Sequence, residues 1–231
     1  MTDAPILAGL PWHWHGILPF ERALVANLDL AAQLRGTETG AVLMFEPERP
    51  VLTLGRRAAK PEGRRTIAST IAACERRGIA VMDADRGGLA TLHAPGQLVV
   101  FVALPPPTPS IPRLVAELLE GARALAGECG VDASLDLCRD VGLWRDASKL
   151  ASVGLRIRDR VVLHGMSINI AIDPTFSAGL TLCGHDALDF ASIQPHVTGL
   201  TAQEAVADAA IYLARHLRMR GAAGASTRSH A

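Results

Sequence analysis

The stretch Arg86-Gly87-Gly88-Leu89-Ala90-Thr91-Leu92-His93-Ala94-Pro95-Gly96-Gln97-Leu98-Val99-Val100-Phe101-Val102-Ala103-Leu104 decides the fold that we expect for this chain. Residues 89–93 and 98–104 are apolar runs on either side of Ala94-Pro95-Gly96-Gln97, which has the composition of a turn. We therefore predict two paired β-strands. The two glycines after Arg86 let the backbone bend sharply or approach a ligand closely, although an ordinary turn needs the same residues.

Outward from this stretch, helical and strand-like patterns follow one another without strict alternation. Helical periodicity and end signals, such as Gly78 after the second helix, mark four segments. We predict helices over residues 19–35, 66–77, 113–129 and 201–220, and strands over residues 41–45, 51–54, 79–82, 135–137, 141–144, 149–157 and 161–170. This order favours an α+β (mixed α/β) fold over a doubly wound parallel sheet. We expect a single catalytic domain over residues 1–220 and a flexible, polar tail over residues 221–231.

The composition limits the function classes. The chain has 231 residues, 49% of them hydrophobic, and its 23 basic residues equal its 23 acidic ones. A general nucleic-acid-binding protein would normally carry a basic excess. The longest uncharged stretch, residues 87–112, contains six prolines and Gly96, which a membrane-spanning helix would not tolerate. Because the start of the chain has no signal-peptide pattern, we expect a cytoplasmic protein.

One cysteine and one lysine stand in distinctive surroundings. Cys183 precedes Gly184 after a loop-like run, and Lys149 opens the apolar strand pattern of residues 149–157. A thiolate is a nucleophile, and a nearby ammonium lowers the pKa of a thiol, so the pair suggests acyl transfer. Each residue also has an ordinary interpretation, as a structural cysteine and as a lysine at a solvated strand end. The four cysteines form no Cys-x-x-Cys pair, so we expect reduced thiols, with Cys74, Cys129 and Cys138 as small buried residues.

Two further features have alternative interpretations. His93 could bind a substrate carbonyl or transfer a proton, but a lone histidine is more often structural, and no His/Cys spacing typical of zinc occurs. A basic run contains Arg56, Arg57, Lys60, Arg64 and Arg65. It is either a solvated loop or a docking surface for an acidic partner protein.

Taken together, these segments resemble the octanoyltransferases of lipoate biosynthesis, or lipoyl(octanoyl) transferases. The family pattern Arg-Gly-Gly-x-x-Thr-x-His-x-Pro-Gly-Gln is matched from Arg86 to Gln97. A second block is Lys149-Leu150-Ala151-Ser152-Val153-Gly154-Leu155-Arg156-Ile157 with His164-Gly165-Met166-Ser167-Ile168-Asn169, and the third is Cys183-Gly184. The chain departs from the family at Leu92, where an aromatic residue is usual, and at Leu182, where proline is common.

The resemblance implies the fold of biotin and lipoate protein ligases and a ping-pong reaction. Cys183 would attack an octanoyl thioester and carry the acyl group as a thioester intermediate. Lys149 would lower the pKa of Cys183 and shuttle protons. A thioester is already activated, so neither ATP, a metal nor another cofactor is implied. The substrate-binding residues would be Arg86, Gly87, Gly88, Leu89, Ala90, Thr91, Leu92, His93, Ser152, Val153, Gly154, Gly165, Met166 and Ser167.

The implied donor is octanoyl-acyl carrier protein, and lipoyl is a possible alternative acyl group. The implied acceptors are lysines on the lipoyl domains of 2-oxoacid dehydrogenase E2 subunits and on the glycine cleavage H protein. No nucleic acid or membrane is implied, and we expect a monomer. Two alternatives stay open: an ATP-dependent lipoate or biotin-type ligase on the same fold, and a non-catalytic protein that binds acyl carriers or lipoyl domains.

Overall fold

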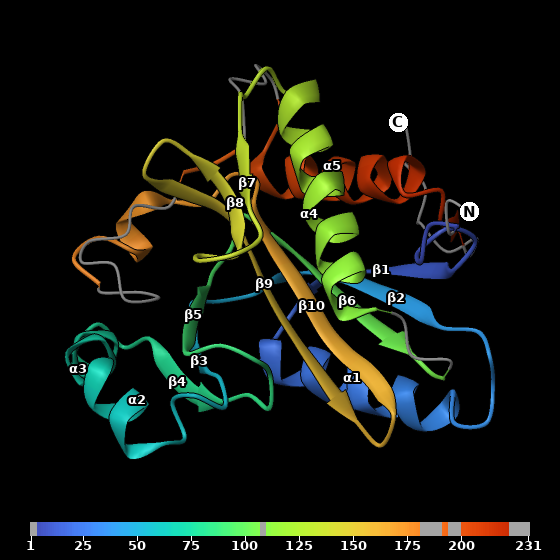
Figure 1. The fold of residues 1–231 in the computed structure, drawn as a ribbon. Helices are drawn as coiled ribbons and strands as arrows, with labels where there is room; N and C mark the ends of the chain where they lie inside the picture. The colour runs from blue at the N-terminus through green and yellow to red at the C-terminus, as the bar shows by residue number, and fades with distance from the viewer. Residues whose placement is uncertain (1–3, 107–109, 181–190, 194–199, 222–231) are drawn as a thin grey trace, which may run out of the picture.

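A large mixed sheet forms the centre of the molecule. The computed structural model describes residues 4–106, 110–180, 191–193 and 200–221. Within these residues the large sheet has eight strands in the order β11-β1-β2-β6-β10-β9-β8-β7 (Figure 1). Its strands are β1 (Pro11–Leu18), β2 (Ala41–Pro47), β6 (Gln97–Leu104), β7 (Ser134–Asp136), β8 (Gly142–Arg145), β9 (Ser148–Arg158), β10 (Val161–Asn169) and β11 (Arg220–Gly221).

A second, smaller sheet lies beside α2 and α3, at the lower left of Figure 1, and has the order β4-β3-β5. It consists of β3 (Val51–Leu54), β4 (Ala80–Asp83) and β5 (Ala90–His93). The pairing that we predicted between residues 89–93 and 98–104 is wrong. β5 pairs with β3, whereas β6 pairs with β2 and β10. The turn between β5 and β6 therefore carries the chain from one sheet to the other.

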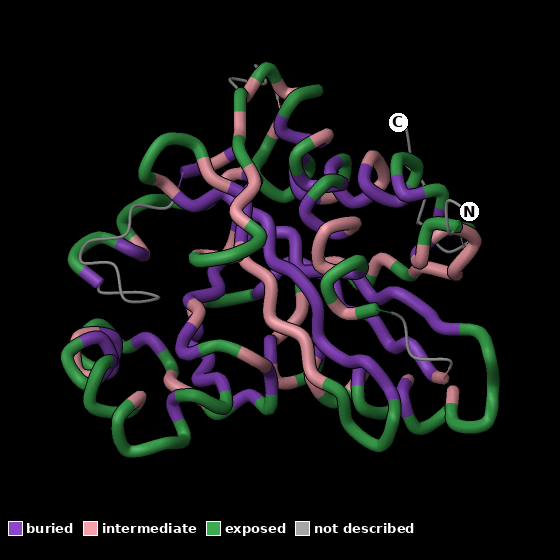
Figure 2. Tube along the Cα trace, in the orientation of Figure 1, coloured by how far each residue is buried: buried purple, intermediate pink, exposed green. Residues whose placement is uncertain are grey.

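The central strands are buried on both faces. All eight residues of β6 and all nine of β10 are buried, which Figure 2 shows in purple. Alternate residues of a strand point to opposite faces. Val100 of β6 accordingly packs in the main core cluster with α4 (Ile111–Glu128) and α5 (Ala202–His216), and Phe101 packs in a second cluster with α1 (Phe20–Gln33). Helices thus cover both faces of the sheet, and the small sheet shares the face that α1 covers.

The helix ends follow the local signals of the sequence. α5 starts with a capping box in which Thr201 and Glu204 satisfy each other's backbone N–H groups. α3 (Ala68–Arg76) stops just before Gly78, which has a positive φ of 69°. The short α2 (Pro61–Thr66) begins with proline at its first turn, and we did not predict it. β1 and the 3-10 turn Pro174–Phe176 were also not predicted, whereas the α+β fold class is confirmed.

The start of the C-terminal tail and two of the three described cysteines differ from what we expected. Gly221, which we placed in a flexible tail, forms part of β11 and pairs with Trp12, and residues 222–231 lie outside the described residues. Cys74 is buried as expected, Cys129 is half-buried, and Cys138 is exposed, contrary to expectation. Among the described residues, no helix is long and apolar enough to cross a membrane.

Candidate active site

A hollow lies where the small sheet meets the large one. It is narrow and partly open to solvent. Nine of the predicted substrate-binding residues line it: Arg86, Thr91, His93, Ser152, Val153, Gly154, Gly165, Met166 and Ser167. The other five residues of the wall were not predicted, and they are Phe20, Ala84, Val99, Phe101 and His164.

The remaining five predicted binding residues do not line this hollow. Ala90 and Leu92 pack in the core of the small sheet, as strand alternation requires when Thr91 and His93 face the hollow. Leu89, just before β5, packs in the same core. Gly87 and Gly88 belong to the loop that carries Arg86. By the same alternation the side chains of Val153 and Met166 pack against the main core.

Arg86 holds the loop at the rim of the hollow. Its side chain is 7% exposed, and its Nη2 donates to the carbonyl and the hydroxyl of Thr53, each at 2.8 Å. Its Nη1 donates to the carbonyl of Gly87 at 2.8 Å, and the N–H of Gly87 donates to the carbonyl of Leu155 at 3.0 Å. A Cβ on Gly154 would lie 3.1 Å from Cδ of Arg86. The arginine therefore ties the loop to the small sheet and lies tightly against β9.

Two neutral histidines line the hollow. Burial, with the nearby charge of Arg86, lowers the pKa of His93 to about 3 and that of His164 to about 4. His93 stacks on Phe20 with ring centroids 4.4 Å apart, and His164 lies edge-on to Phe101 at 5.6 Å. The hollow is thus lined by uncharged aromatic rings beside one buried guanidinium.

His93 and His164 are held differently. Neither ring nitrogen of His93 has a hydrogen-bond partner among the described residues. His164 has a positive φ of 61°, and its N–H donates to Oδ1 of Asn27 at 3.0 Å. Asn27 in turn donates to the carbonyl of Val102 at 2.9 Å, so a buried amide from α1 satisfies this irregular point of β10. His164 directly precedes Gly165, a predicted binding residue, and this position in the sequence could have identified His164 as a site residue.

Lys149 lies on β9, three residues before Ser152 of the hollow wall. It is 5% exposed, and its Nζ lies 4.6 Å from the centroid of the Trp144 ring on β8. A Cβ on Gly142 would come within 2.5 Å of Cε of Lys149. The lysine is therefore buried and does not lie at a solvated strand end, and its side chain passes between a glycine and an indole face.

A chain of amides connects Lys149 to the end of the Arg86–Gln97 motif. Asn169 donates to the carbonyl of Lys149 at 2.9 Å, and Gln97 donates to Oδ1 of Asn169 at 2.8 Å. At the same turn Gly96, with φ of 87°, donates to Oε1 of Glu46 at 2.8 Å. Through Asn169 of β10, Gln97 of β6 thus helps to hold the backbone of Lys149 on β9.

Cys183 lies outside the described residues, so its distance from Lys149 is not part of this description. The segment before it is anchored to α3. Arg77 donates to the carbonyl of Ala178 at 3.1 Å and to that of Thr175. Leu180 is buried in the core of the small sheet. The described chain up to Leu180 therefore lies against the small sheet.

Comparisons with known proteins agree with this architecture. The sequence model of the lipoyl protein ligase A/B catalytic domain matches residues 20–208. The octanoyltransferase of Chromobacterium violaceum is 32% identical over 201 residues, which cover 86% of this chain and 90% of that one. The octanoyltransferase of Geobacter metallireducens is 32% identical over 180 residues, covering 77% and 79% of the two chains.

The fold also resembles a solved structure of lipoate-protein ligase A bound with ATP. The two share 13% sequence identity and a TM-score of 0.71, over 93% of this chain and 87% of the ligase. Two sheets that enclose a hollow beside a buried lysine define a lipoate-ligase-like catalytic domain. The chain belongs to the lipoyl protein ligase A/B catalytic domain family.

Proposed function

We propose that this protein is an octanoyltransferase that moves an octanoyl group from octanoyl-acyl carrier protein to a lysine of a lipoyl domain. The observation that carries the proposal is the burial of Lys149 on the strand whose next residues line an apolar hollow. The relatives named octanoyltransferase cover most of this chain at 32% identity, whereas the ATP-bound ligase shares 13%. These likenesses favour the transferase over the ligase. We place the reaction in the cytoplasm.

The hollow is the proposed site for the acyl chain. Phe20, Val99 and Phe101 supply apolar side chains, and burial in such a site stabilises an acyl chain by about 0.8 kcal/mol per methylene group. The low pKa values of His93 and His164 keep both rings neutral near pH 7, so they add no charge beside the chain. Ser152 and Ser167 lie directly opposite each other on β9 and β10 and face the same hollow.

In the first half-reaction the Cys183 thiolate attacks the thioester carbonyl of the donor. A new sulfur–carbon bond forms, and the bond to the pantetheine sulfur breaks. Lys149, as an ammonium, gives a proton to the departing thiolate and so becomes neutral. The octanoyl group is then held on Cys183 as a thioester.

In the second half-reaction the amine of the acceptor lysine attacks this thioester. An amide bond forms, the bond to Cys183 breaks, and Lys149 takes the proton that the amine loses. The cysteine leaves as a thiolate, and the enzyme returns to its starting state. No ATP is consumed because the donor thioester is already activated.

Intact-protein mass spectrometry tests this proposal. The protein mixed with octanoyl-acyl carrier protein, without ATP, should gain one octanoyl group that a thiol reagent removes. Cys183→Ser should gain none, and Lys149→Ala should gain it far more slowly. Lys60 is the other lysine of the chain, so Lys60→Ala is a matched control with a small octanoyl thioester as donor. Modification with free octanoate and ATP but not with the thioester would favour a ligase, and binding without any adduct would favour a non-catalytic protein.

A further inference from the structure

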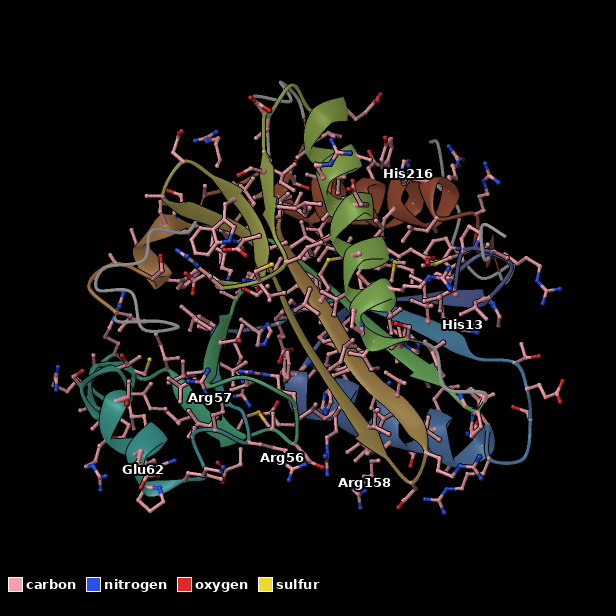
Figure 3. The ribbon with its side chains drawn as sticks, viewed as in Figure 1. His13, Arg56, Arg57, Glu62, Arg158 and His216 are labelled. Carbon is pink, nitrogen blue, oxygen red and sulfur yellow. The ribbon has the colours of Figure 1, made fainter. Side chains whose placement is uncertain are left out.

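The charge of this protein is unevenly distributed. Residues 56–77 hold seven of the 23 basic residues and two of the 23 acidic ones, which leaves 16 basic and 21 acidic residues elsewhere. A chain of zero net charge therefore has one strongly basic segment on an otherwise acidic background. This segment comprises α2, α3 and the loop before α2, and Figure 3 labels Arg56, Arg57 and Glu62 within it.

Several of these basic side chains are exposed and have no carboxylate partner. Arg56 pairs with Asp85 at 3.8 Å, and Arg65 pairs with Glu62 at 3.8 Å. Arg57, Lys60 and Arg64 are exposed and form no ion pair within the described residues. We call the exposed residues Arg56, Arg57, Lys60, Arg64 and Arg65 the basic surface. Among the described residues, three of its five charges thus lack a carboxylate partner, and they can attract an acidic partner protein.

The basic surface is fixed to the wall of the candidate active site. Gly55, Arg56 and Arg57 donate backbone hydrogen bonds to the carbonyls of Leu89, Arg86 and Gly88, at 2.7, 3.0 and 3.1 Å. A shallow groove lined by Arg56, Arg64 and the 83–85 loop lies next to the hollow, and Ala84 lines both. A protein that docks on this surface therefore takes a fixed position relative to the acyl site.

The distance from the basic surface to Lys149 indicates the kind of partner. Asp85 joins Arg56 to Arg156 of β9, and Arg156 is seven residues along the strand from Lys149. At about 3.3 Å per residue this separation is about 23 Å. A partner docked at the Arg56 end of these contacts is therefore suited to deliver its reactive group to Lys149 on a long arm. An acyl carrier protein has such an arm, its phosphopantetheine, whereas a lipoyl domain must bring a lysine side chain directly to the acyl group.

We propose that the basic surface docks the acidic acyl carrier protein that delivers the acyl thioester. This inference rests on the proposed function and adds the surface on which the donor protein docks. Long-range attraction between the two proteins would accelerate the productive encounter and weaken as salt rises. The basic surface would not change the rate of acylation by a small donor that lacks the carrier protein.

The test compares two donors on charge-reversal variants. Arg57→Glu/Arg64→Glu changes the basic surface, and Arg22→Glu/Arg215→Glu is the matched control on α1 and α5, whose two arginines are also exposed. Single-turnover acylation is measured with octanoyl-acyl carrier protein and with S-octanoyl-N-acetylcysteamine. We expect the first variant to lower the second-order rate constant of acylation by the carrier-protein donor by about tenfold or more at low salt and to flatten its salt dependence. The small donor should react with all variants at the wild-type rate.

Three results would overturn the docking proposal. These are unchanged acylation by the carrier-protein donor, an equal loss with both donors, and an equal loss in the control variant. Transfer from the acylated enzyme to a lipoyl domain is measured in parallel, and a loss confined to that step would assign the surface to the acceptor instead. Wild-type protein that neither donor acylates would overturn the proposed function and the docking with it, a result distinct from the others. Melting temperatures of all variants establish that they are folded.

Discussion

The side chain of Lys149 shows how single residues define this site. Its ammonium lies 4.6 Å from the centroid of an indole ring and is almost entirely removed from solvent. Within the described residues it forms no ion pair with a carboxylate. The indole is itself fixed, because Nε1 of Trp144 donates to the carbonyl of Asp140 at 2.9 Å. Trp144 is therefore a positioning residue for the lysine, and this contact can be tested separately from folding.

Removing the aromatic face should slow acylation. A cation over an aromatic face gains about 0.5–2 kcal/mol, so Trp144→Leu should lower the single-turnover rate of Cys183 acylation by about twofold to thirtyfold. Trp144→Phe keeps a ring face and should retain more of the rate. The measurement is adduct formation against time with a small octanoyl thioester. A Leu variant that reacts at the wild-type rate would show that the ring contributes nothing to the lysine.

Among the elements, β10 is tightly constrained, because it lies between β6 and β9 and all nine of its residues are buried. A Cβ on Gly165 would lie 2.1 Å from the carbonyl oxygen of Val100, whereas a Cβ on Gly127 of α4 would meet nothing within 4 Å. Gly165→Ala should therefore destabilise the protein by about 1–3 kcal/mol through overpacking. Gly127→Ala should stabilise it by about 0.5–1 kcal/mol because alanine favours a helix interior. Urea unfolding measures the change in the free energy of unfolding for each variant, and the two changes should have opposite signs. Changes of the same sign would contradict the close packing of β10 against β6.

Local patterns predicted the elements better than their partners. Residues 51–54 were predicted as a strand with the bounds that β3 has, and the other long strands and helices except β1 lie close to their predicted ranges. The supposed hairpin of β5 and β6 was wrong because apolar runs around a turn specify strands but not which sheet each strand joins. Nine of the predicted binding residues line the hollow, because the motif glycines and polar residues alternate with core residues. Phe20 and Asn27 could not be predicted, since tertiary packing alone brings α1 to the site.

For the whole molecule, the hollow marks the junction between its two sheets. His93 comes from β5 of the small sheet and His164 from β10 of the large one, and both rings are neutral at the junction because burial opposes their charge. Burial of the two rings opposes their protonation when the pH falls. The folded state therefore binds fewer protons than the unfolded chain between the folded pKa values, about 3 and about 4, and the unfolded value near 6.5. In this window stability falls as the pH falls, and it is fully recovered above pH about 6.5.

Replacing His93 should reduce this acid sensitivity. With a folded pKa of about 3, His93 accounts for a loss of about 2 kcal/mol in unfolding free energy between pH 7 and pH 5. His93→Gln titrates nothing there, so its unfolding free energy should fall by about 2 kcal/mol less over the same interval, whatever its stability at pH 7. Thr91→Ser is the matched control, because it removes a methyl group from the same hollow and should shift the stability equally at both pH values. Urea unfolding at the two pH values provides the measurement. If His93→Gln loses as much stability as the wild type, His93 is not held neutral by burial, and the junction between the sheets does not respond to acid through this ring.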